Sequence, residues 1–257
     1  MNVFRFCLTA RHSLSHNLNM FKTLPARHHS TDTRRRILST ALAVFRQRGL
    51  DAATMREISR AAGVALGAGY YYFPSKEAII QAYYDDVQKE HWARVNAALA
   101  NSELDLEARL RTAFHTKLDI LQGDRKLLGA LFRYTGEPDH PLSILGEGTR
   151  QNREQSTAVF TLAIGEEKLP ADIRSLLPAG LWALHMGILL YFIYDASPAQ
   201  ERSRKLVDGA LKLIVQMLSL AKVPLLKPFR GRLLSLLGDA GLLPEPLSPA
   251  PFSLQEE

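Results

Sequence analysis

The sequence is poor in the residues that would indicate a secreted or metal-binding protein. Cys7 is the single cysteine among 257 residues, so no disulfide can form within the chain. Small secreted domains depend on disulfides, and a lone thiol favours a reducing, cytoplasmic location. No H-E-x-x-H pair is present, and Cys7 has no second cysteine with which to hold a metal. We therefore expect neither a metal site nor a cofactor.

Catalytic signatures are missing as well. The nucleophile motif G-x-S-x-G and the phosphate-binding loop G-x-x-x-x-G-K-[ST] do not occur. Gly146 and Gly148 lack the third glycine of a dinucleotide-binding loop and do not follow an expected strand. Acidic side chains are scattered, as they are on solvated helix faces. We therefore predict that the protein is not an enzyme.

The sequence also lacks the pattern of a β-strand, because no long stretch alternates polar and apolar residues. Apolar residues recur at helical spacing over 37–45, and Gly49 is suited to end that helix. The pattern predicts an all-α chain. Further helices are expected near 104–121, 124–135, 141–165, 171–194 and 199–220, with a short apolar helix at 229–237.

Positive charge is concentrated near the N-terminus. The chain has 32 Lys and Arg against 26 Asp and Glu, a net charge of +6. Residues 1–30 contain four basic and no acidic residues, and 31–64 contain seven arginines against three acidic residues, whereas the remainder is slightly acidic. A basic front on a near-neutral body predicts a polyanion-binding unit joined to another domain.

The two ends differ in composition from the middle. Residues 1–30 are rich in Arg, His and Ser, which resembles a mitochondrial transit peptide. We favour the alternative that they form a disordered extension, or that the start is assigned too far upstream and Met20 is the true initiator. Residues 223–257 are predicted to form a short helix followed by a proline-rich tail, of which about the last dozen residues are expected to be disordered.

A helix-turn-helix pattern lies within the basic region. Thr54 and Glu57 have the spacing of a capping box that opens a short helix over 55–61. Gly63 suits the left-handed turn that lets a second helix, 65–72, cross the first steeply. Ser75 then caps a long helix. In this motif the second helix enters the major groove of DNA.

The block from 33 to 84 resembles the DNA-binding domain of the TetR/AcrR family of transcriptional regulators. The matching residues are the helix ending at Phe45 and Gly49, the Thr54 cap, Ile58-x-x-x-Ala62-Gly63-Val64 and Tyr70-Tyr71-x-Phe73-x-Ser75-Lys76-Glu77. The resemblance implies a helix-turn-helix domain at 31–92 and a helical ligand-binding and dimerisation domain at 93–222. It also implies a homodimeric repressor that binds a pseudo-palindromic operator in double-stranded DNA.

The expected DNA contacts come from the first helix, the Thr54 cap and the second helix of the motif. They are Arg34, Arg35, Arg36, Thr54, Met55, Arg56, Ala65, Leu66, Gly67, Ala68, Tyr70, Tyr71, Tyr72 and Lys76. No charged residue occurs over 65–75, so bidentate base reading by Arg is not available from this helix. We expect thymine-methyl contacts, close backbone approach at Gly67, and discrimination through Met55, Arg56 and DNA shape. Because this helix is uncharged, an alternative hypothesis stays open. The protein would then be a ligand-binding or protein-interaction module without sequence-specific DNA binding.

The regulatory half is expected to bind a small, mostly apolar effector with one polar handle. The candidate residues are Phe114, His115, Phe132, Arg133, Trp182, His185 and Tyr191. The alternative for each aromatic residue is an ordinary place in the core, and for each histidine a satisfied or exposed position.

One segment, 175–194, has no formal charge over twenty residues. A membrane span and a buried helix are both possible interpretations, and we favour a helix partly covered by a second subunit. The resemblance implies that this segment and the helix bearing Leu206, Leu211, Leu213, Ile214 and Leu218 form a four-helix bundle between subunits.

Overall fold

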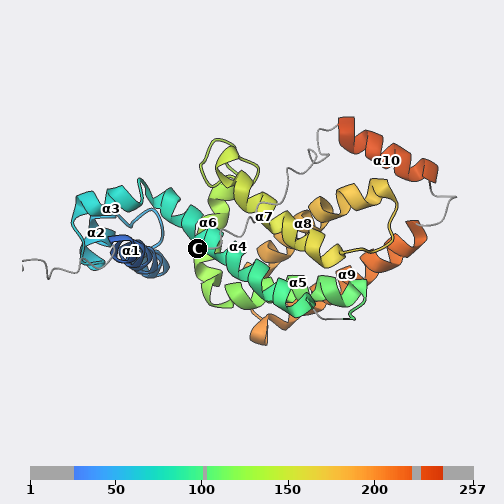
Figure 1. Ribbon diagram of the computed structural model, residues 1–257, viewed down its shortest axis with the longest axis horizontal. Helices are drawn as coiled ribbons and strands as arrows, with labels where there is room; N and C mark the ends of the chain where they lie inside the picture. The colour runs from blue at the N-terminus through green and yellow to red at the C-terminus, as the bar shows by residue number, and fades with distance from the viewer. Residues whose placement is uncertain (1–25, 101–102, 222–226, 240–257) are drawn as a thin grey trace, which may run out of the picture.

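The computed structural model describes residues 26–100, 103–221 and 227–239, and these contain helices and no strand, as predicted. The α-helices are α1 (Ala26–Arg48), α2 (Met55–Ala61), α3 (Leu66–Tyr72), α4 (Lys76–Leu99), α5 (Leu106–Leu121), α6 (Arg125–Thr135), α7 (Arg150–Ile164), α8 (Ala171–Tyr194), α9 (Glu201–Ala221) and α10 (Lys227–Asp239). Three short 3-10 helices are η1 (Gln122–Asp124), η2 (Glu147–Thr149) and η3 (Pro198–Gln200). Helices α1–α3 form one end of the molecule, and α4 leads from them into a larger helical body (Figure 1).

Local signals in the sequence set the boundaries of the first helices. Gly49 adopts φ +80° and its N–H donates to the Phe45 carbonyl at 2.8 Å, which ends α1. Thr54 Oγ1 accepts from the N–H of Glu57 at 3.2 Å and so caps α2. The Glu57 carboxylate pairs with Arg48 at 2.8 Å. Gly63 takes φ +66° in the turn between α2 and α3, as predicted.

The N-terminal unit has a closed apolar core. Ile37, Phe45, Ile58 and Phe73 are each at most 2% exposed, and all belong to the same buried cluster. Phe73 and Phe45 thus belong to the same core, while Tyr72 lies at the edge of this cluster. Burying such side chains contributes roughly 1.5–3 kcal/mol each, so packing rather than helix propensity orders the short α2 and α3.

Helix α4 belongs to two cores. Ile79, Ile80 and Tyr83 pack into the N-terminal cluster, whereas Val95 packs into the cluster of the larger body. Ser75 caps this helix by accepting from the N–H of Ala78 at 3.1 Å. The domain boundary expected between residues 92 and 93 falls inside α4, so the two units share one continuous helix.

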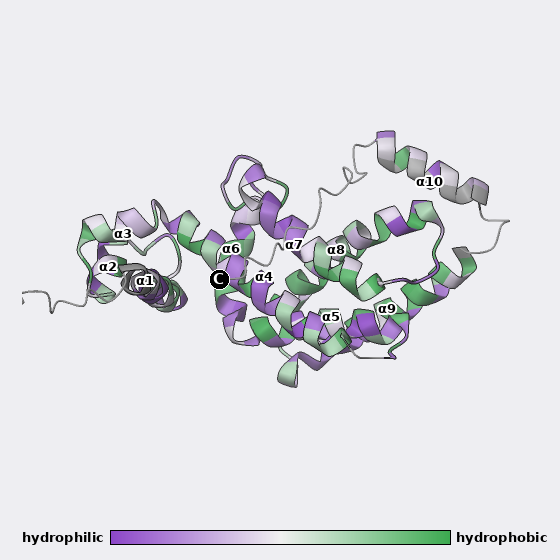
Figure 2. Ribbon diagram, in the orientation of Figure 1, coloured by the Kyte–Doolittle hydropathy of each residue, from purple (hydrophilic) through white to green (hydrophobic). Residues whose placement is uncertain are grey.

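The larger body packs α5, α7, α8 and α9 around a second core. Helix α8 is hydrophobic along most of its length (Figure 2), and by length and composition it could cross a membrane. Leu181, Ile188 and Phe192 on this helix are each at most 2% exposed, because they pack against the neighbouring helices. This burial supports the interpretation of α8 as a core helix.

Two expected boundaries differ from the structure. The helix expected over 141–165 begins only at Arg150, since turns and η2 occupy the residues before it. Pro141 and two glycines favour that turn, and a Cβ on Gly148 would lie 2.5 Å from the Pro141 carbonyl oxygen. Helix α1 begins at Ala26, so the final residues of the expected 1–30 extension are helical. Residues 1–25 and 240–257, with the expected extension and tail, lie outside the described residues; the helix expected at 229–237 is present as α10.

Candidate DNA-binding face and ligand cavity

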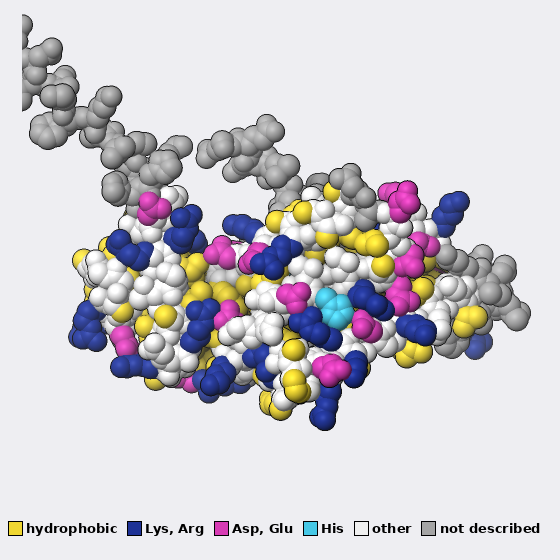
Figure 3. All heavy atoms as spheres, turned by 90° about the horizontal axis from the view of Figure 1, so that it is seen from below, with side chains coloured by type: hydrophobic (Ala, Val, Ile, Leu, Met, Phe, Trp, Pro, Cys, Tyr) yellow, Lys and Arg dark blue, Asp and Glu magenta, His cyan; other side chains and the backbone are white. Residues whose placement is uncertain are grey.

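The outer face of α3 presents aromatic and apolar side chains to solvent. Tyr71 is 81% exposed, Tyr70 50% and Leu66 37%, whereas Gly69 is buried against α2. Arg34, Arg35 and Arg36 are exposed on α1, and several Lys and Arg side chains lie on the face of this end that Figure 3 shows. An exposed uncharged helix flanked by cations is suited to meet a groove while the cations contact phosphates.

Some expected DNA contacts already have partners within the protein. The Arg34 guanidinium lies 4.8 Å from the centre of the Phe73 ring, a cation–π contact. Arg35 pairs with Asp32 at 3.5 Å on the surface. Lys76 Nζ donates to the Leu50 carbonyl at 2.6 Å and thereby holds the loop before α2. Such partners do not prevent a phosphate contact, since a side chain at the surface can exchange them.

Met55, one of the expected DNA contacts, is not exposed at the surface. Its side chain is only 7% exposed and belongs to the core of the N-terminal unit. The reason is its place as the first residue of α2, from which it points inward beside Ile58. Thr54, Arg56, Ala65, Leu66, Gly67, Tyr70 and Tyr71 are exposed, while Ala68, Tyr72 and Lys76 are half-buried.

A cavity of about 120 Å³ lies within the larger body, close to its junction with the N-terminal unit. It is bounded by α4, α5, α6, α7, α8 and the segment before α7. The lining residues are Tyr83, Tyr84, Val87, Gln88, Lys117, Leu121, Leu128, Leu131, Phe132, Thr135, Leu142, Ile144, Thr149, Asn152, Arg153, Ser156, Trp182, His185, Met186 and Leu189. Most of these side chains are apolar, as is common in small-molecule sites.

The cavity brings together three of the seven expected ligand residues, namely Phe132, Trp182 and His185. Phe114 is fully buried behind it, with its ring centre 5.6 Å from that of His185. Tyr191 is 41% exposed on α8 and does not line the cavity.

Arg133 also lies away from the cavity. It forms an ion pair with Asp51, in the loop between α1 and α2, and Tyr134 donates to the same carboxylate. These contacts hold the pKa of Asp51 below its usual value, the hydrogen bond from Tyr134 being the larger cause. Adjacent residues of α6 thus face different surroundings, Phe132 the cavity and Arg133 the loop of the helix-turn-helix unit.

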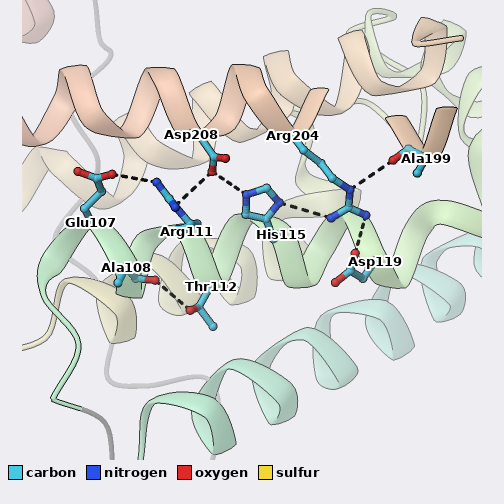
Figure 4. A network of polar contacts seen from close by, with 9 residues as sticks. All are labelled: Glu107, Ala108, Arg111, Thr112, His115, Asp119, Ala199, Arg204 and Asp208. Carbon is cyan, nitrogen blue, oxygen red and sulfur yellow. Dashed lines mark hydrogen bonds and ion pairs between the residues drawn. The ribbon is translucent and has the colours of Figure 1, made fainter. Parts of the chain in front are cut away.

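His115 lies in a polar network on the outside of the body (Figure 4). Its Nε2 is 2.9 Å from Asp208 on α9, and Asp208 is also 3.2 Å from Arg111. Arg204 pairs with Asp119 at 2.6 Å and approaches the other ring nitrogen of His115 at 3.4 Å. The network fastens α5 to α9, so the role of His115 in this structure is to hold two helices together.

Sequence reasoning missed the most unusual residue of the cavity wall, Lys117. Its side chain is 2% exposed and donates to Gln88 Oε1 at 2.7 Å. Burial lowers the pKa of Lys117 to about 7. The signal was present, because Lys117 follows Leu110 and Phe114 in the apolar stripe of α5, and a charge there must be buried.

His185 lies in the same wall. It is 1% exposed, and neither ring nitrogen has a hydrogen-bond partner among the described residues. Burial lowers the pKa of His185 well below its usual value, and the nearby charge of Lys117 lowers it further, so the ring is neutral.

Helix α6 connects the cavity with the DNA-binding unit. Phe132 lines the cavity, whereas Leu127 packs into the core of the N-terminal unit. At the start of α6, Asp124 accepts from Arg46 of α1 at 2.7 Å and from the Tyr83 hydroxyl of α4 at 2.8 Å. A displacement of α6 would therefore move residues in both units.

Comparisons with known proteins agree with this arrangement. Residues 37–83 match the family model for bacterial regulatory proteins of the tetR family, and 109–230 match a tetracyclin repressor-like C-terminal domain. The HTH-type transcriptional repressor KstR2 of Rhodococcus jostii is 34% identical over 150 residues, which cover 54% of this chain and 69% of the repressor. The regulator AcrR of Shigella flexneri is 33% identical over 78 residues, covering 30% of this chain and 33% of its own length.

Solved structures show the same fold. A TetR transcriptional regulator from Nitrosomonas europaea superposes with a TM-score of 0.57 at 19% identity, covering 70% of this chain and 96% of the other. A TetR-family regulator from Syntrophomonas wolfei gives a TM-score of 0.60 at 18% identity, covering 72% and 95%. The helix-turn-helix geometry, the helical body and these similarities agree, and the chain belongs to the TetR family of transcriptional regulators.

Proposed function

We propose that this regulator is a homodimeric repressor of the cytoplasm that binds a pseudo-palindromic operator and releases it when a small effector fills the cavity. The observation that carries the proposal is the sharing of α6 and α4 between the cavity wall and the core of the helix-turn-helix unit. A ligand changes the DNA affinity only if it binds the DNA-binding and the DNA-releasing conformations of the protein with different affinities. Contacts to Phe132 on α6 and to Val87 and Gln88 on α4 supply a route for that difference.

An exposed apolar face on α8 and α9 supports the dimer. Its members are large side chains that are at least 41% exposed: Leu190, Tyr191, Tyr194, Leu206, Leu213, Met217 and Leu220. Leu211 and Leu218, also expected in the bundle, are instead buried within the subunit, and Ile214 is half-buried. An apolar face of this kind on two neighbouring helices marks an association surface. A two-fold dimer would place two copies of α3 on successive major grooves.

Selection of bound sequences from a random duplex library tests the proposal. Purified full-length protein at roughly physiological salt is expected to recover a palindromic motif, with half-sites about one helical turn apart. The affinity for that duplex should fall steeply with salt, with a log–log slope of about −0.9 for each phosphate contacted.

The alternative of a binding module without sequence-specific DNA recognition predicts the opposite result. A folded, dimeric preparation that recovers no motif would support that alternative and would contradict the repressor proposal. A Tyr71→Ala variant tests the proposed contact face, since Tyr71 is 81% exposed and its loss should weaken DNA binding without unfolding the domain.

A further inference from the structure

The charged side chains that line the cavity are all basic. Its lining contains two basic residues, Lys117 and Arg153, and no aspartate or glutamate. Buried charges in proteins are normally paired, because transfer of an isolated charge from water is unfavourable. A mostly apolar cavity with cations and no acid in its wall is suited to an anionic group.

Lys117 is the cation with unused donors. An ammonium group has three N–H donors, and the described residues provide Lys117 with one acceptor, Gln88 Oε1 at 2.7 Å. No carboxylate of the described residues is within ion-pair distance of Lys117 Nζ. Glu90 on α4 raises the pKa of Lys117 from farther away, but that side chain is exposed on the surface.

Arg153, in contrast, is already engaged. Its Nη1 donates to the carbonyls of Ile144 at 2.9 Å and Gly146 at 3.4 Å, which fixes the turn before α7. Asn152, another polar lining residue, donates to Asp85 at 2.5 Å. These polar groups therefore serve the fold, and Lys117, which is 2% exposed while Arg153 is half-buried, is the deeply buried cation of the wall.

His185 adds a second available donor to the wall. Its ring is held by Phe114 and Phe160, each with its ring centre 5.6 Å away, and by His91, which stacks at 6.4 Å. A neutral imidazole has one N–H donor and one acceptor, and both lack partners here among the described residues. A buried donor without a partner is unfavourable, so a ligand that accepts from it gains affinity.

We propose that the cavity binds a small monocarboxylic acid whose carboxylate accepts hydrogen bonds from Lys117 Nζ and from the ring N–H of His185, with an apolar body against Phe132, Trp182 and Leu189. The volume of about 120 Å³ limits the body to a few carbon atoms. For scale, an apolar cavity of about 150 Å³ holds benzene. This inference rests on the proposed function in taking the cavity as the effector site.

Calorimetric titration with two matched pairs of probes tests the inference. Propanoate and butanoate are compared with propanamide and butanamide at pH 6.5, using the full-length dimer. Each amide keeps the apolar body and removes the charge. We expect each acid to bind at least tenfold more tightly than its amide, and Lys117→Met to remove that preference, since methionine retains an unbranched side chain.

Lys168→Met is the control variant. Lys168 is exposed between α7 and α8, outside the cavity, so this variant makes the same change in net charge and should bind the acids as the wild type does. His185→Phe, which keeps an aromatic ring but removes its N–H, should weaken acid binding severalfold. Equal affinities for acid and amide, unchanged acid binding by Lys117→Met, or no saturable binding of either acid would each overturn the inference.

The same proteins, titrated with the duplex recovered by selection, separate this inference from the proposed function. If butanoate binds through Lys117 and leaves the DNA affinity unchanged, the acid site stands and effector-controlled release of DNA is contradicted. If DNA binding is sequence-specific and both acids fail to bind, the acid site alone is contradicted.

Discussion

The N-terminal unit and the larger body place their functional groups in opposite environments. In the N-terminal unit the core is apolar, and the groups offered to DNA, such as Tyr71 and Arg36, stand in solvent. In the larger body the candidate functional groups, Lys117 and His185, are almost fully buried. A DNA-binding surface therefore adds little instability to its domain, whereas a ligand site inside a core weakens the fold until its ligand binds.

The largest expected effect is on the stability of the body. The folded pKa of Lys117, about 7, lies below the ordinary value of 10.5, so between these values the unfolded chain binds more protons. The wild-type free energy of unfolding should therefore rise with pH above 7, and below pH 7 the full penalty of the buried charge is present. Lys117→Met removes this contribution. Its stability advantage over the wild type should shrink by roughly 3 kcal/mol between pH 6 and pH 9, nearly all of it above pH 7, where the slope is about 1.4 kcal/mol per pH unit.

Urea titrations followed by tryptophan fluorescence measure this difference, because Trp92 and Trp182 both lie in the body. Lys168→Met should track the wild type at each pH. A difference between Lys117→Met and wild type that does not vary with pH would show that Lys117 is not buried as a charged group, and the contrast between the two units would be lost.

The next effect concerns the surface of the N-terminal unit. Replacement of Arg34, Arg35 and Arg36 by glutamine should reduce DNA affinity roughly a hundredfold per subunit at 0.15 M salt, if each contacts one phosphate. The log–log salt slope should decrease by about 2.7 per subunit, which is about 5.4 for the dimer, and thermal stability should change little because all three are exposed. Fluorescence anisotropy with the selected duplex at several salt concentrations gives both values.

A triple variant at Arg94, Arg150 and Arg202 controls for net charge. These arginines are exposed on α4, α7 and α9, away from α3, so glutamine at all three should leave the salt slope near the wild-type value. If both triple variants lower the affinity equally, the effect comes from net charge, and the three arginines of α1 have no specific phosphate contacts.

Two glycines of α3 allow a smaller, local test within the N-terminal unit. A Cβ on Gly69 would lie 2.1 Å from Ser59 Oγ, whereas a Cβ on Gly67 would have no heavy atom within 4 Å. Gly69→Ala should therefore lower stability by about 1 kcal/mol, and Ser59→Ala in the same chain should restore it. Gly67→Ala should raise stability by about 0.5 kcal/mol and weaken DNA binding, if the backbone approaches DNA there. Thermal unfolding and anisotropy separate these results.

The two units also differ in how far the sequence predicts them. Gly49, Thr54, Gly63 and Ser75 fix helix ends through hydrogen bonds over three or four residues, so a local pattern was sufficient to predict them. The cavity depends on which faces of distant helices meet. Successive residues on a helix point about 100° apart. Candidate ligand residues that are chosen by residue type alone therefore include neighbours that do not face the cavity.

Phe132 and Arg133 illustrate the limit. Both were expected to contact the ligand, yet only Phe132 lines the cavity. Lys117 was missed because no charge was expected in an apolar stripe, although its position among Leu110, Phe114 and Leu121 was readable from the sequence.

The smallest expected effect tests whether the two units are coupled through the surface as well as through α6. Arg133 and Tyr134 both contact the Asp51 carboxylate, which joins α6 to the loop before α2. The contact is exposed, so Arg133→Gln with Tyr134→Phe should leave thermal stability nearly unchanged. It should nevertheless change the affinity of the unliganded dimer for its selected duplex by two- to fivefold, because the contact biases the position of the helix-turn-helix unit relative to the body. Arg150→Gln, which breaks an ion pair with Glu154 on α7, should change neither value. An unchanged DNA affinity in the double variant would assign the coupling to the buried faces of α4 and α6 alone.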